Sequence, residues 1–215
     1  VLDVYDIPVF YFPKFFHPDP SVKRRSGLLQ PRLNSSEILG TSINIPYYYV
    51  ISDNKDYTFK PTIFDDRIYM FQNEYRVENK NSSFIADFGY TKGYKSKSAD
   101  NRNGMSHLFS KLNLDLDLKN FISSKMDFFV EKVSMDTYLA IFEDVLLTDR
   151  TFKNDLKDFN SMTSGLKLSL DHDDYNFTAG FTSYENLQAT KNSDRFQYSF
   201  PYYNFSTSLL SNPET

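Results

Sequence analysis

Apolar and polar residues alternate along most of the chain with a period of two, which is typical of β-strands. The longest such stretch covers residues 108–118, where five leucines share one face and the other face carries Phe109, Lys111, Asn113, Asp115 and Asp117. Shorter alternations cover residues 126–131, 166–171 and 175–182. Because only the polar His172-Asp173-Asp174 separates the last two, these segments predict an antiparallel hairpin.

The strands predicted nearer the amino terminus are richer in tyrosine and phenylalanine. Apolar residues alternate in four segments, residues 43–51, 57–63, 69–77 and 84–90. The connections between strands are of two kinds: some are short and polar, whereas residues 91–103 and 134–161 form long ones. The whole pattern predicts an all-β chain of about ten antiparallel strands, each of about 9–12 residues.

Two segments depart from this alternation. In the second long connection, apolar residues fall at helical spacing at Met135, Tyr138, Leu139, Phe142, Val145 and Leu146. This spacing predicts a short helix, with an irregular strand as the alternative. Five prolines interrupt the apolar stretches of the first 33 residues. We interpret residues 1–33 as the end of a preceding domain and a crossing segment, and we expect the chain to be part of a longer protein.

Alternation alone does not say where the apolar face points. In a soluble sandwich it points into the core, and in a transmembrane barrel it points at lipid while the polar face lines the lumen. The predicted strands are long enough for a tilted crossing of a bilayer, and short turns alternate with long loops. Aromatic residues also recur near the strand ends, as in the girdles of outer-membrane barrels. These three features favour the barrel.

Composition narrows the possible functions. The 215 residues include 24 Lys+Arg and 28 Asp+Glu, a formal net charge of −4, which argues against a nucleic-acid-binding domain. The chain has no cysteine, so disulfides and cysteine-ligated metals within it are excluded. The mean hydropathy is −0.51, and no run approaches the roughly 18–20 apolar residues that a membrane-spanning helix needs.

Candidate catalytic groups are sparse. His17, His107 and His172 are far apart in the sequence, and there is no nucleophile elbow, phosphate loop or metalloprotease helix. The acidic segments Asp171–Asp174 and Asp100–Gly104 resemble metal-binding loops, but Arg102 occupies a ligand position in the second. We interpret both segments as solvated loops. The sequence therefore predicts no enzyme activity, no cofactor and no metal.

Several short motifs occur in a definite order. The first part of the chain contains IPVFYFP at Ile7–Pro13, RRSGLL at Arg24–Leu29, IPYYY at Ile45–Tyr49 and DYTFKP at Asp56–Pro61. The second part contains DTYL at Asp136–Leu139, SDRFQY at Ser193–Tyr198 and then Phe200-Pro201. This ordered set resembles the LptD family of outer-membrane lipopolysaccharide-assembly proteins, from Ile7 to about residue 206. No single motif is decisive, whereas their order and spacing are specific.

The resemblance implies a periplasmic β-jellyroll followed by a very large barrel of about two dozen strands. Residues 1–33 would be the end of the jellyroll and the crossing segment, and residues 34–215 the first part of the barrel. The implied function is insertion of lipopolysaccharide into the outer leaflet of the bacterial outer membrane. The implied partners are lipopolysaccharide, an LptE-like lipoprotein plug and an LptA-like periplasmic bridge. This chain departs from the family pattern in lacking cysteine and in having Leu28 and Phe196 where phenylalanine and tyrosine are usual.

Three sets of residues are candidates for this function. Pro46 and Pro61 fall inside the first two predicted barrel strands, where each removes a ladder donor. The resemblance implies a lateral gate there, and the alternative is that both prolines mark strand ends. Arg24 and Arg25 are either a guide for lipid phosphates or a solvated basic patch in the connecting segment. The third set, predicted to face the lumen, comprises Lys111, Asn113, Asp115 and Asp117.

Two other functions remain open at this stage. The first is a general outer-membrane porin or receptor barrel, from which a lateral seam at the first strand would distinguish a lipopolysaccharide-assembly protein. The second is a secreted β-sandwich that binds carbohydrate through its aromatic residues. Dependence on detergent would separate the membrane proteins from the soluble sandwich.

Overall fold

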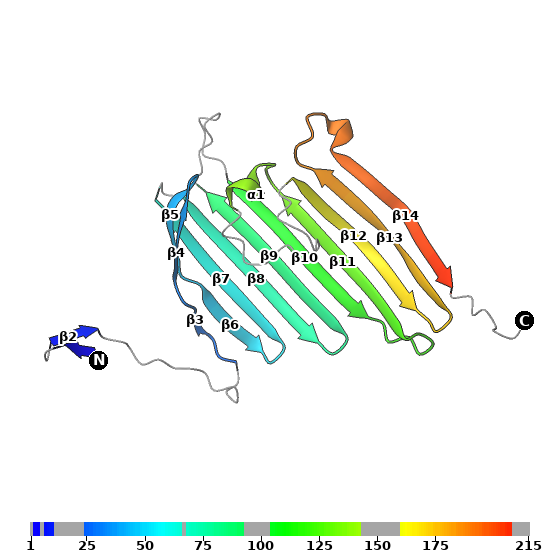
Figure 1. Cartoon of the computed structure of the whole chain (residues 1–215), viewed down its shortest axis with the longest axis horizontal. Coiled ribbons are helices and arrows are strands. Elements are labelled where there is room, and N and C mark those ends of the chain that lie inside the picture. Colours follow the sequence, from blue (N-terminus) through cyan, green and yellow to red (C-terminus); the bar gives the residue numbers. More distant parts are fainter. Residues whose placement is uncertain are drawn as a thin grey trace, which may run out of the picture.

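The computed structural model describes residues 2–4, 7–10, 24–65, 68–92, 104–142 and 160–207. In this part of the chain, one antiparallel sheet of 12 strands dominates the structure (Figure 1). The predicted all-β class and the antiparallel arrangement are therefore confirmed.

Most strands of the sheet are 10–12 residues long, in agreement with the length of the alternating segments. The first strands, which are shorter, are β3 (Gly27–Leu28), β4 (Arg32–Ser36), β5 (Gly40–Asn44) and β6 (Tyr47–Ser52). The long strands are β7 (Lys55–Phe64), β8 (Tyr69–Asn79), β9 (Ser82–Lys92), β10 (Met105–Asp115), β11 (Ser123–Val133), β12 (Ser161–Asp171), β13 (Tyr175–Asn186) and β14 (Phe196–Thr207). From β7 to β14, neighbouring strands follow one another in sequence as a meander, whereas β7 pairs with both β5 and β6, β4 with β5, and β3 with β6.

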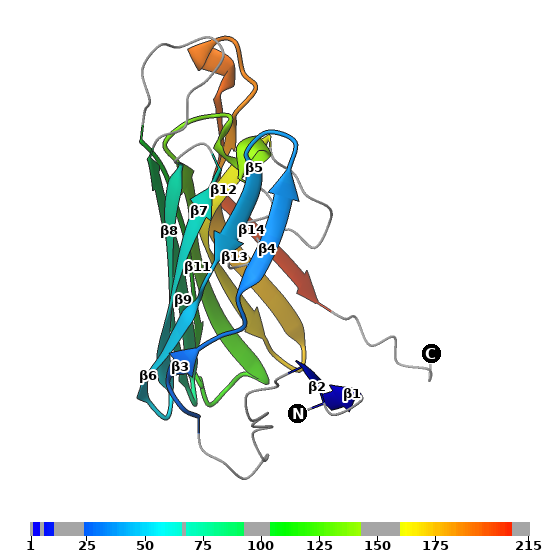
Figure 2. The same cartoon turned by 90° about the vertical axis from the view of Figure 1, so that its left-hand side faces the viewer.

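The sheet is curved and open. Figure 2 shows that β4 and β14, at its two ends, both lie on the same side of β8 and β9, so the sheet has a concave face. The strand order ends at β14 on one edge and at β4 on the other, with β3 paired to β6 below β4. The sheet thus has the form expected for part of a larger barrel.

The two ends of the sheet have different connections. At the lower end in Figure 1, β6 and β7, β8 and β9, and β12 and β13 are joined by tight turns. The predicted hairpin at His172-Asp173-Asp174 is confirmed, because Asp171 pairs with Asn176 and His172 N–H donates to Tyr175 O. The upper end carries α1 (Tyr138–Ile141) and the short 3-10 helix η2 (Asn192–Asp194).

The predicted helix is confirmed as α1, although this helix is shorter than the apolar spacing suggested. Val145 and Leu146 lie outside the described residues. Tyr138, Leu139 and Phe142 are fully buried and belong to one apolar cluster at the upper end of the sheet. The other members of this cluster are Leu39, Phe64, Ile68, Met70, Met105, Phe109, Val133, Met162 and Leu187.

Two predicted boundaries are wrong. The segment 43–51 is not one strand, because β5 ends at Asn44 and β6 begins at Tyr47. The alternation to residue 118 overestimates β10, which ends at Asp115. Asp117 lies in the following connection with a φ of 48°. β3 and the first two residues of β4 belong to the same sheet, and the domain boundary between residues 33 and 34 stays a prediction.

At the amino terminus, β1 (Leu2–Val4) and β2 (Ile7–Phe10) form a separate antiparallel pair. The proline-rich motif that begins at Ile7 therefore starts as a strand. Among the described residues, no helix is long and apolar enough to cross a membrane.

Candidate functional site

The two faces of the sheet have opposite character. On the face that carries α1, which is the concave face in Figure 2, β7 presents Asp56, Thr58, Lys60 and Thr62, all nearly buried. The same face of β8 presents Gln72 and Glu74, and that of β9 presents Asp87 and Thr91. Polar side chains thus cover much of the concave face, and the apolar cluster lies only at its upper end.

The convex face carries large apolar side chains in register from strand to strand. Leu112 lies opposite Phe128, Phe128 opposite Leu166, and Leu166 opposite Phe181. Other members of this band are exposed although they are large, among them Ile43, Ile63, Tyr69, Phe71, Phe88 and Leu108. Exposed apolar patches of this extent mark a surface that meets lipid or another protein.

Three of the four residues predicted to face the lumen share the concave face. Lys111, Asn113 and Asp115 alternate on β10, and Asp115 lies directly opposite Lys125 of β11. Asp117 is separate from them, because it lies beyond the strand end and donates its N–H to Asp115 Oδ1 at 3.2 Å.

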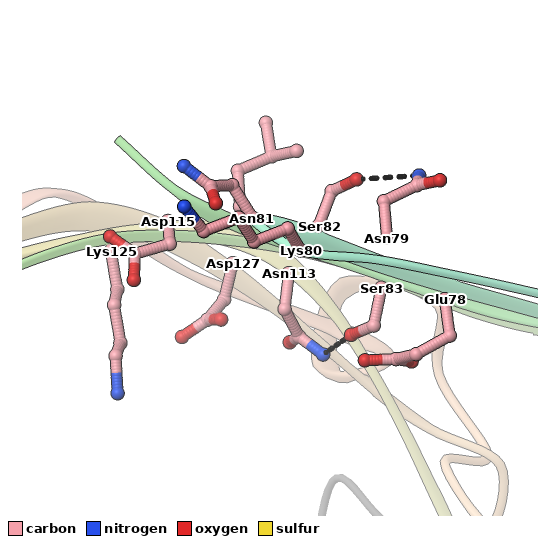
Figure 3. Close-up of a pocket in the computed structure, with 11 residues that line it drawn as sticks. Glu78, Asn79, Lys80, Asn81, Ser82, Ser83, Asn113, Asp115, Lys125 and Asp127 are labelled. Atoms are coloured by element: carbon pink, nitrogen blue, oxygen red, sulfur yellow. Dashed lines mark hydrogen bonds between the residues drawn. The ribbon is translucent and has the colours of Figure 1, made fainter. Parts of the chain in front are cut away.

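Asn113 and Asp115 border a polar pocket of about 390 Å³ at the turn end of β8 to β11 (Figure 3). Asn113 donates to Ser83 Oγ at 2.8 Å, and Asp127 and Lys125 extend from the same side of the sheet. The pocket therefore combines hydroxyl, amide and charged groups of both signs, which suit contact with water and sugars.

The arrangement of β10 predicts how introduced cysteines will react. We expect Asn113→Cys in the intact protein to react with a hydrophilic thiol reagent, because residue 113 faces the polar pocket. Leu112→Cys, one residue away on the convex face, should react mainly with a lipid-soluble reagent. The rates of labelling in outer-membrane vesicles measure this, and the reverse pattern would contradict the assignment of the faces.

Pro46 and Pro61 lie on neighbouring strand segments at an interruption of the sheet, on adjacent register pairs and not directly opposite one another. Asn44 pairs with Thr62 and Tyr47 pairs with Phe59, so the register places Ile45 opposite Pro61. We call Ile45, Pro46, Lys60 and Pro61 the proline break. Pro46 lies between two strands, as the alternative interpretation supposed, whereas Pro61 lies inside β7.

The backbone hydrogen bonds of the two carbonyl groups show which strand faces the missing N–H of each proline. Ile45 N–H donates to Pro61 O at a long 3.4 Å, and Leu29 N–H donates to Pro46 O at 2.8 Å. The N–H and C=O of one residue in an antiparallel ladder point to the same neighbouring strand. The missing donor of Pro61 therefore faces Ile45, and that of Pro46 faces Leu29. We call the pairing of β3 and β4 with β5 and β6 the first hairpin. It lacks one backbone N–H donor between its own strands, at Pro46, and one at its border with β7, at Pro61.

Arg24 ties the segment before β3 to the wall of the sheet. Its guanidinium bonds the Asp56 carboxylate and lies over the ring of Tyr48, at 5.6 Å from the centroid. The hydrogen bond to Asp56 raises the pKa of Arg24 above its usual value. Arg76 holds the other Asp56 oxygen at 2.8 Å, so one buried carboxylate is shared by two arginines. The side chain of Arg25 is exposed.

Because Arg24 bonds Asp56 and Arg25 is exposed, we expect substitutions of the two arginines to have different effects. Arg24→Gln should loosen the segment before β3, because Asp56 loses a charge-assisted hydrogen bond from a half-exposed guanidinium. Arg25→Gln is the matched control and should leave this segment as firmly held as in the wild type. Limited proteolysis of the region around residue 24 in the assembled protein measures this. Equal cleavage of both variants would contradict the anchoring role of Arg24.

A buried polar chain joins α1 to the wall. His107 Nδ1 lies 2.7 Å from the Tyr138 hydroxyl, and His107 Nε2 lies 3.2 Å from Asp87 Oδ1. Burial raises the pKa of Tyr138 far above its usual value, so its phenol stays protonated and shares a hydrogen bond with Nδ1. Gly89 is required here, because a Cβ at this position would lie 2.3 Å from the imidazole ring. Sequence reasoning missed this chain of contacts.

A second polar cluster joins two of the motifs at the upper end. Arg195 bonds both Asp136 oxygens, at 2.7 and 3.1 Å, and also bonds Glu185 at 2.8 Å. The bonds to Asp136 are the main reason that the pKa of Arg195 is raised. Lys132 contacts the other Glu185 oxygen at 2.9 Å. The SDRFQY motif is thereby linked to the DTYL motif, which also contributes Tyr138.

The candidates for metal chemistry find no support in the described residues. Across residues 24–65, 68–92, 104–142 and 160–207, no group of three or more potential ligands could hold a metal ion. His172 lies in the β12–β13 turn and stacks on Tyr175, with ring centroids 4.6 Å apart. His17 and most of the Asp100–Gly104 segment lie outside the part of the chain that the structure describes.

Known proteins match the chain over parts of its length. It is 28% identical to the LPS-assembly protein LptD of Idiomarina loihiensis over 140 residues, which cover 65% of this chain and 18% of that protein. It is 34% identical over 128 residues to LptD of Nitrosococcus oceani, covering 54% of this chain and 16% of the relative. It is 43% identical over 76 residues to LptD of a Polaromonas species, covering 35% of this chain and 9% of the relative. The chain resembles LptD.

The resemblance to LptD inferred from the motifs is thus confirmed by independent matches to several proteins of that name. No family model matches the chain. The matched regions span less than a fifth of the LptD relatives, at 18%, 16% and 9% of their lengths. The activity, substrate and partners of a whole LptD are therefore matters of proposal for this chain.

Proposed function

We propose that this chain forms the first part of an outer-membrane barrel that inserts lipopolysaccharide into the outer leaflet. The observation that carries the proposal is the combination of LptD similarity with an open 12-stranded sheet, polar on its concave face and apolar on its convex face. An apolar outer band and a polar interior are what a transmembrane barrel requires. The apolar face would contact lipid, and further strands would close the sheet.

The orientation of the barrel follows from its connections. Outer-membrane barrels have short periplasmic turns and longer extracellular loops. The tight turns at the lower end, where the segment preceding β3 also enters the sheet, would then face the periplasm. We place the passage from the periplasmic segment to the wall at Gly27, with a jellyroll before it. α1 and the Arg195 cluster would lie at the extracellular mouth.

The proposed mechanism is lateral opening of the wall at the proline break. Backbone groups without partners are costly in hydrocarbon, so a barrel wall normally resists parting. Two backbone N–H donors are missing at the first hairpin, at Pro46 and Pro61. Separation of the strands there therefore breaks fewer hydrogen bonds. The sugars of lipopolysaccharide would pass along the polar concave face while the acyl chains leave sideways into lipid. No covalent chemistry is needed, in accord with a transport role and no enzyme activity.

The partners in this proposal are lipopolysaccharide, an LptE-like lipoprotein within the barrel and an LptA-like bridge that meets the jellyroll. The similarity to LptD is what supports them. Arg24 and Arg25 could contribute to lipid passage as a phosphate guide, and Arg24 would do so while held by Asp56. Unchanged export in the Arg24→Ala plus Arg25→Ala variant would refute that role.

The test of the function is depletion in the native host. When synthesis of the full-length protein is switched off, newly made lipopolysaccharide should stop arriving at the cell surface while it continues to accumulate inside. Re-expression of the protein should restore arrival. A porin or receptor would instead show loss of solute uptake with normal surface lipopolysaccharide, and that outcome would refute the proposal.

A further inference from the structure

A basic pocket lies beside the proline break. It has a volume of about 390 Å³, and its lining includes Arg32, Asn44, Pro46, Thr58 and Lys60. Arg32 lies directly opposite Asn44, and Asn44 directly opposite Thr62, so these side chains share one face of the sheet. This is the polar concave face, and the pocket therefore opens on the side from which a sugar headgroup would approach the break.

Two positive charges meet at this pocket. Arg32 lies close enough to Lys60 for their charges to repel one another. Lys60 is only 8% exposed, so water screens this repulsion poorly. Asp87 is a carboxylate that attracts Lys60. Asp56, four residues before Lys60 on the same face of β7, is bonded by Arg24 and Arg76. Arg32 thus adds a second positive side chain beside Lys60 in the pocket lining, and a bound anion would reduce the repulsion between the two.

An unsatisfied amide points to the same conclusion. Asn44 is fully buried, and neither its Nδ2 nor its Oδ1 has a hydrogen-bond partner among the described residues. Buried polar groups are hydrogen-bonded in nearly all native structures, and an exception needs an explanation. Because Asn44 lines the pocket between Arg32 and Lys60, a ligand with oxygen acceptors would satisfy its Nδ2 donors.

We propose that this pocket binds a phosphate group on the sugar head of the transported lipid while the lipid passes the break. A guanidinium, an ammonium and an amide donor together suit a phosphate, which offers several oxygen acceptors and negative charge. This inference rests on the proposed function and names the chemical group that the opening wall recognises. Binding there holds the headgroup on the polar side while the chains enter lipid.

The experiment places a photo-crosslinking amino acid at Gln30, which lines the pocket, in the full-length protein in cells. Lipopolysaccharide should crosslink at residue 30 in the otherwise unchanged protein. Arg32→Gln with Lys60→Gln should lower the crosslinked fraction at least about tenfold, as expected when a charge-assisted contact is lost. Lys167→Gln removes a lysine from the same face at β12 and should leave the crosslink unchanged.

Two further arms identify the source of the phosphate. With purified protein in detergent, lipopolysaccharide whose lipid phosphates have been removed should crosslink at residue 30 as weakly as the double variant does. Inorganic phosphate at millimolar concentration should compete only weakly with the intact lipid. Equal crosslinking of the dephosphorylated lipid, or full protection by inorganic phosphate, would overturn the assignment to the headgroup.

The outcomes separate this inference from the proposed function. If the double variant crosslinks and exports lipopolysaccharide like the wild type, the phosphate site is refuted and the function stands. If lipopolysaccharide does not crosslink at any position of the concave face and its surface arrival does not depend on the protein, the function fails as well. Should the double variant not assemble, Arg32→Gln alone supplies the test, because the Arg32 side chain is exposed.

Discussion

Replacing Tyr138 by alanine should release α1 from the wall and lower the free energy of unfolding by roughly 3–5 kcal/mol, as for other buried aromatic residues. Tyr138 is fully buried, its ring packs 5.1 Å from that of Phe142, and its hydroxyl bonds His107. The alanine variant loses all of these contacts at once and leaves a cavity in the apolar cluster. Chemical denaturation of the barrel in detergent, followed by heat-modifiable gel mobility, measures the loss.

The matched control is Tyr138→Phe, which keeps the ring and removes only the hydroxyl. Because His107 Nδ1 then stays buried without its hydrogen-bond partner, we expect a cost of about 1–3 kcal/mol. A phenylalanine variant as unstable as the alanine variant would mean that the polar chain through His107, and not packing, holds α1. If neither variant changed stability, α1 would not be anchored at Tyr138.

The second large effect is expected at the proline break. Pro46→Ala and Pro61→Ala each restore a backbone donor, one facing Leu29 and the other facing Ile45. A backbone hydrogen bond contributes about 0.5–1.5 kcal/mol in water, and its loss costs more in hydrocarbon. If both bonds must break when the wall opens, the double variant should slow lipopolysaccharide export about tenfold or more. The rate of arrival at the cell surface measures this, with heat-modifiable mobility as the check on assembly.

The single variants sharpen this result. Pro61→Ala acts at the border between the first hairpin and β7, whereas Pro46→Ala acts within the hairpin. A slowing caused only by Pro61→Ala would locate the moving border next to β7, and a slowing caused only by Pro46→Ala would locate it inside the hairpin. Wild-type export in the double variant, with normal assembly, would remove both prolines from the opening mechanism.

The faces of the sheet were predictable from the sequence because side chains alternate strictly across a strand. Leu112, Phe128 and Leu166 each belong to a period-two segment, and the structure aligns them in one row. The hairpin at His172 was predictable for a similar reason, since a short polar turn between two such segments leaves little choice of topology.

The ends of strands were harder to predict. Leu116 and Leu118 continue the alternation beyond Asp115, but they lie in the connection to β11, where the strand has ended although Leu116 N–H still donates to Ser124 O at 2.8 Å. Pro46 likewise interrupts a strand without disturbing the apolar pattern on either side of it. Alternation reports which face a side chain occupies, and it carries no information on whether the backbone has a partner.

The contacts between motifs could not be predicted at all. Arg24 and Asp56 are 32 residues apart, His107 and Tyr138 are 31 apart, and Arg195 and Asp136 are 59 apart. Local sequence carries no signal for such pairs, which depend on the register of the whole sheet. In the structure, the RRSGLL motif meets the DYTFKP motif, and SDRFQY meets DTYL.

The most direct test of the central claim, that the wall opens at the proline break, is a reversible lock beside it. Ile43 and Ile63 are register partners on the convex face, two residue pairs above the break, so Ile43→Cys with Ile63→Cys can form a disulfide across β5 and β7. Phe88→Cys with Leu108→Cys is the matched pair on β9 and β10. The account predicts that oxidation of the first pair stops lipopolysaccharide arrival at the cell surface, that reductant restores it, and that oxidation of the second pair has no effect. Undiminished arrival with the first pair fully oxidised would contradict the account.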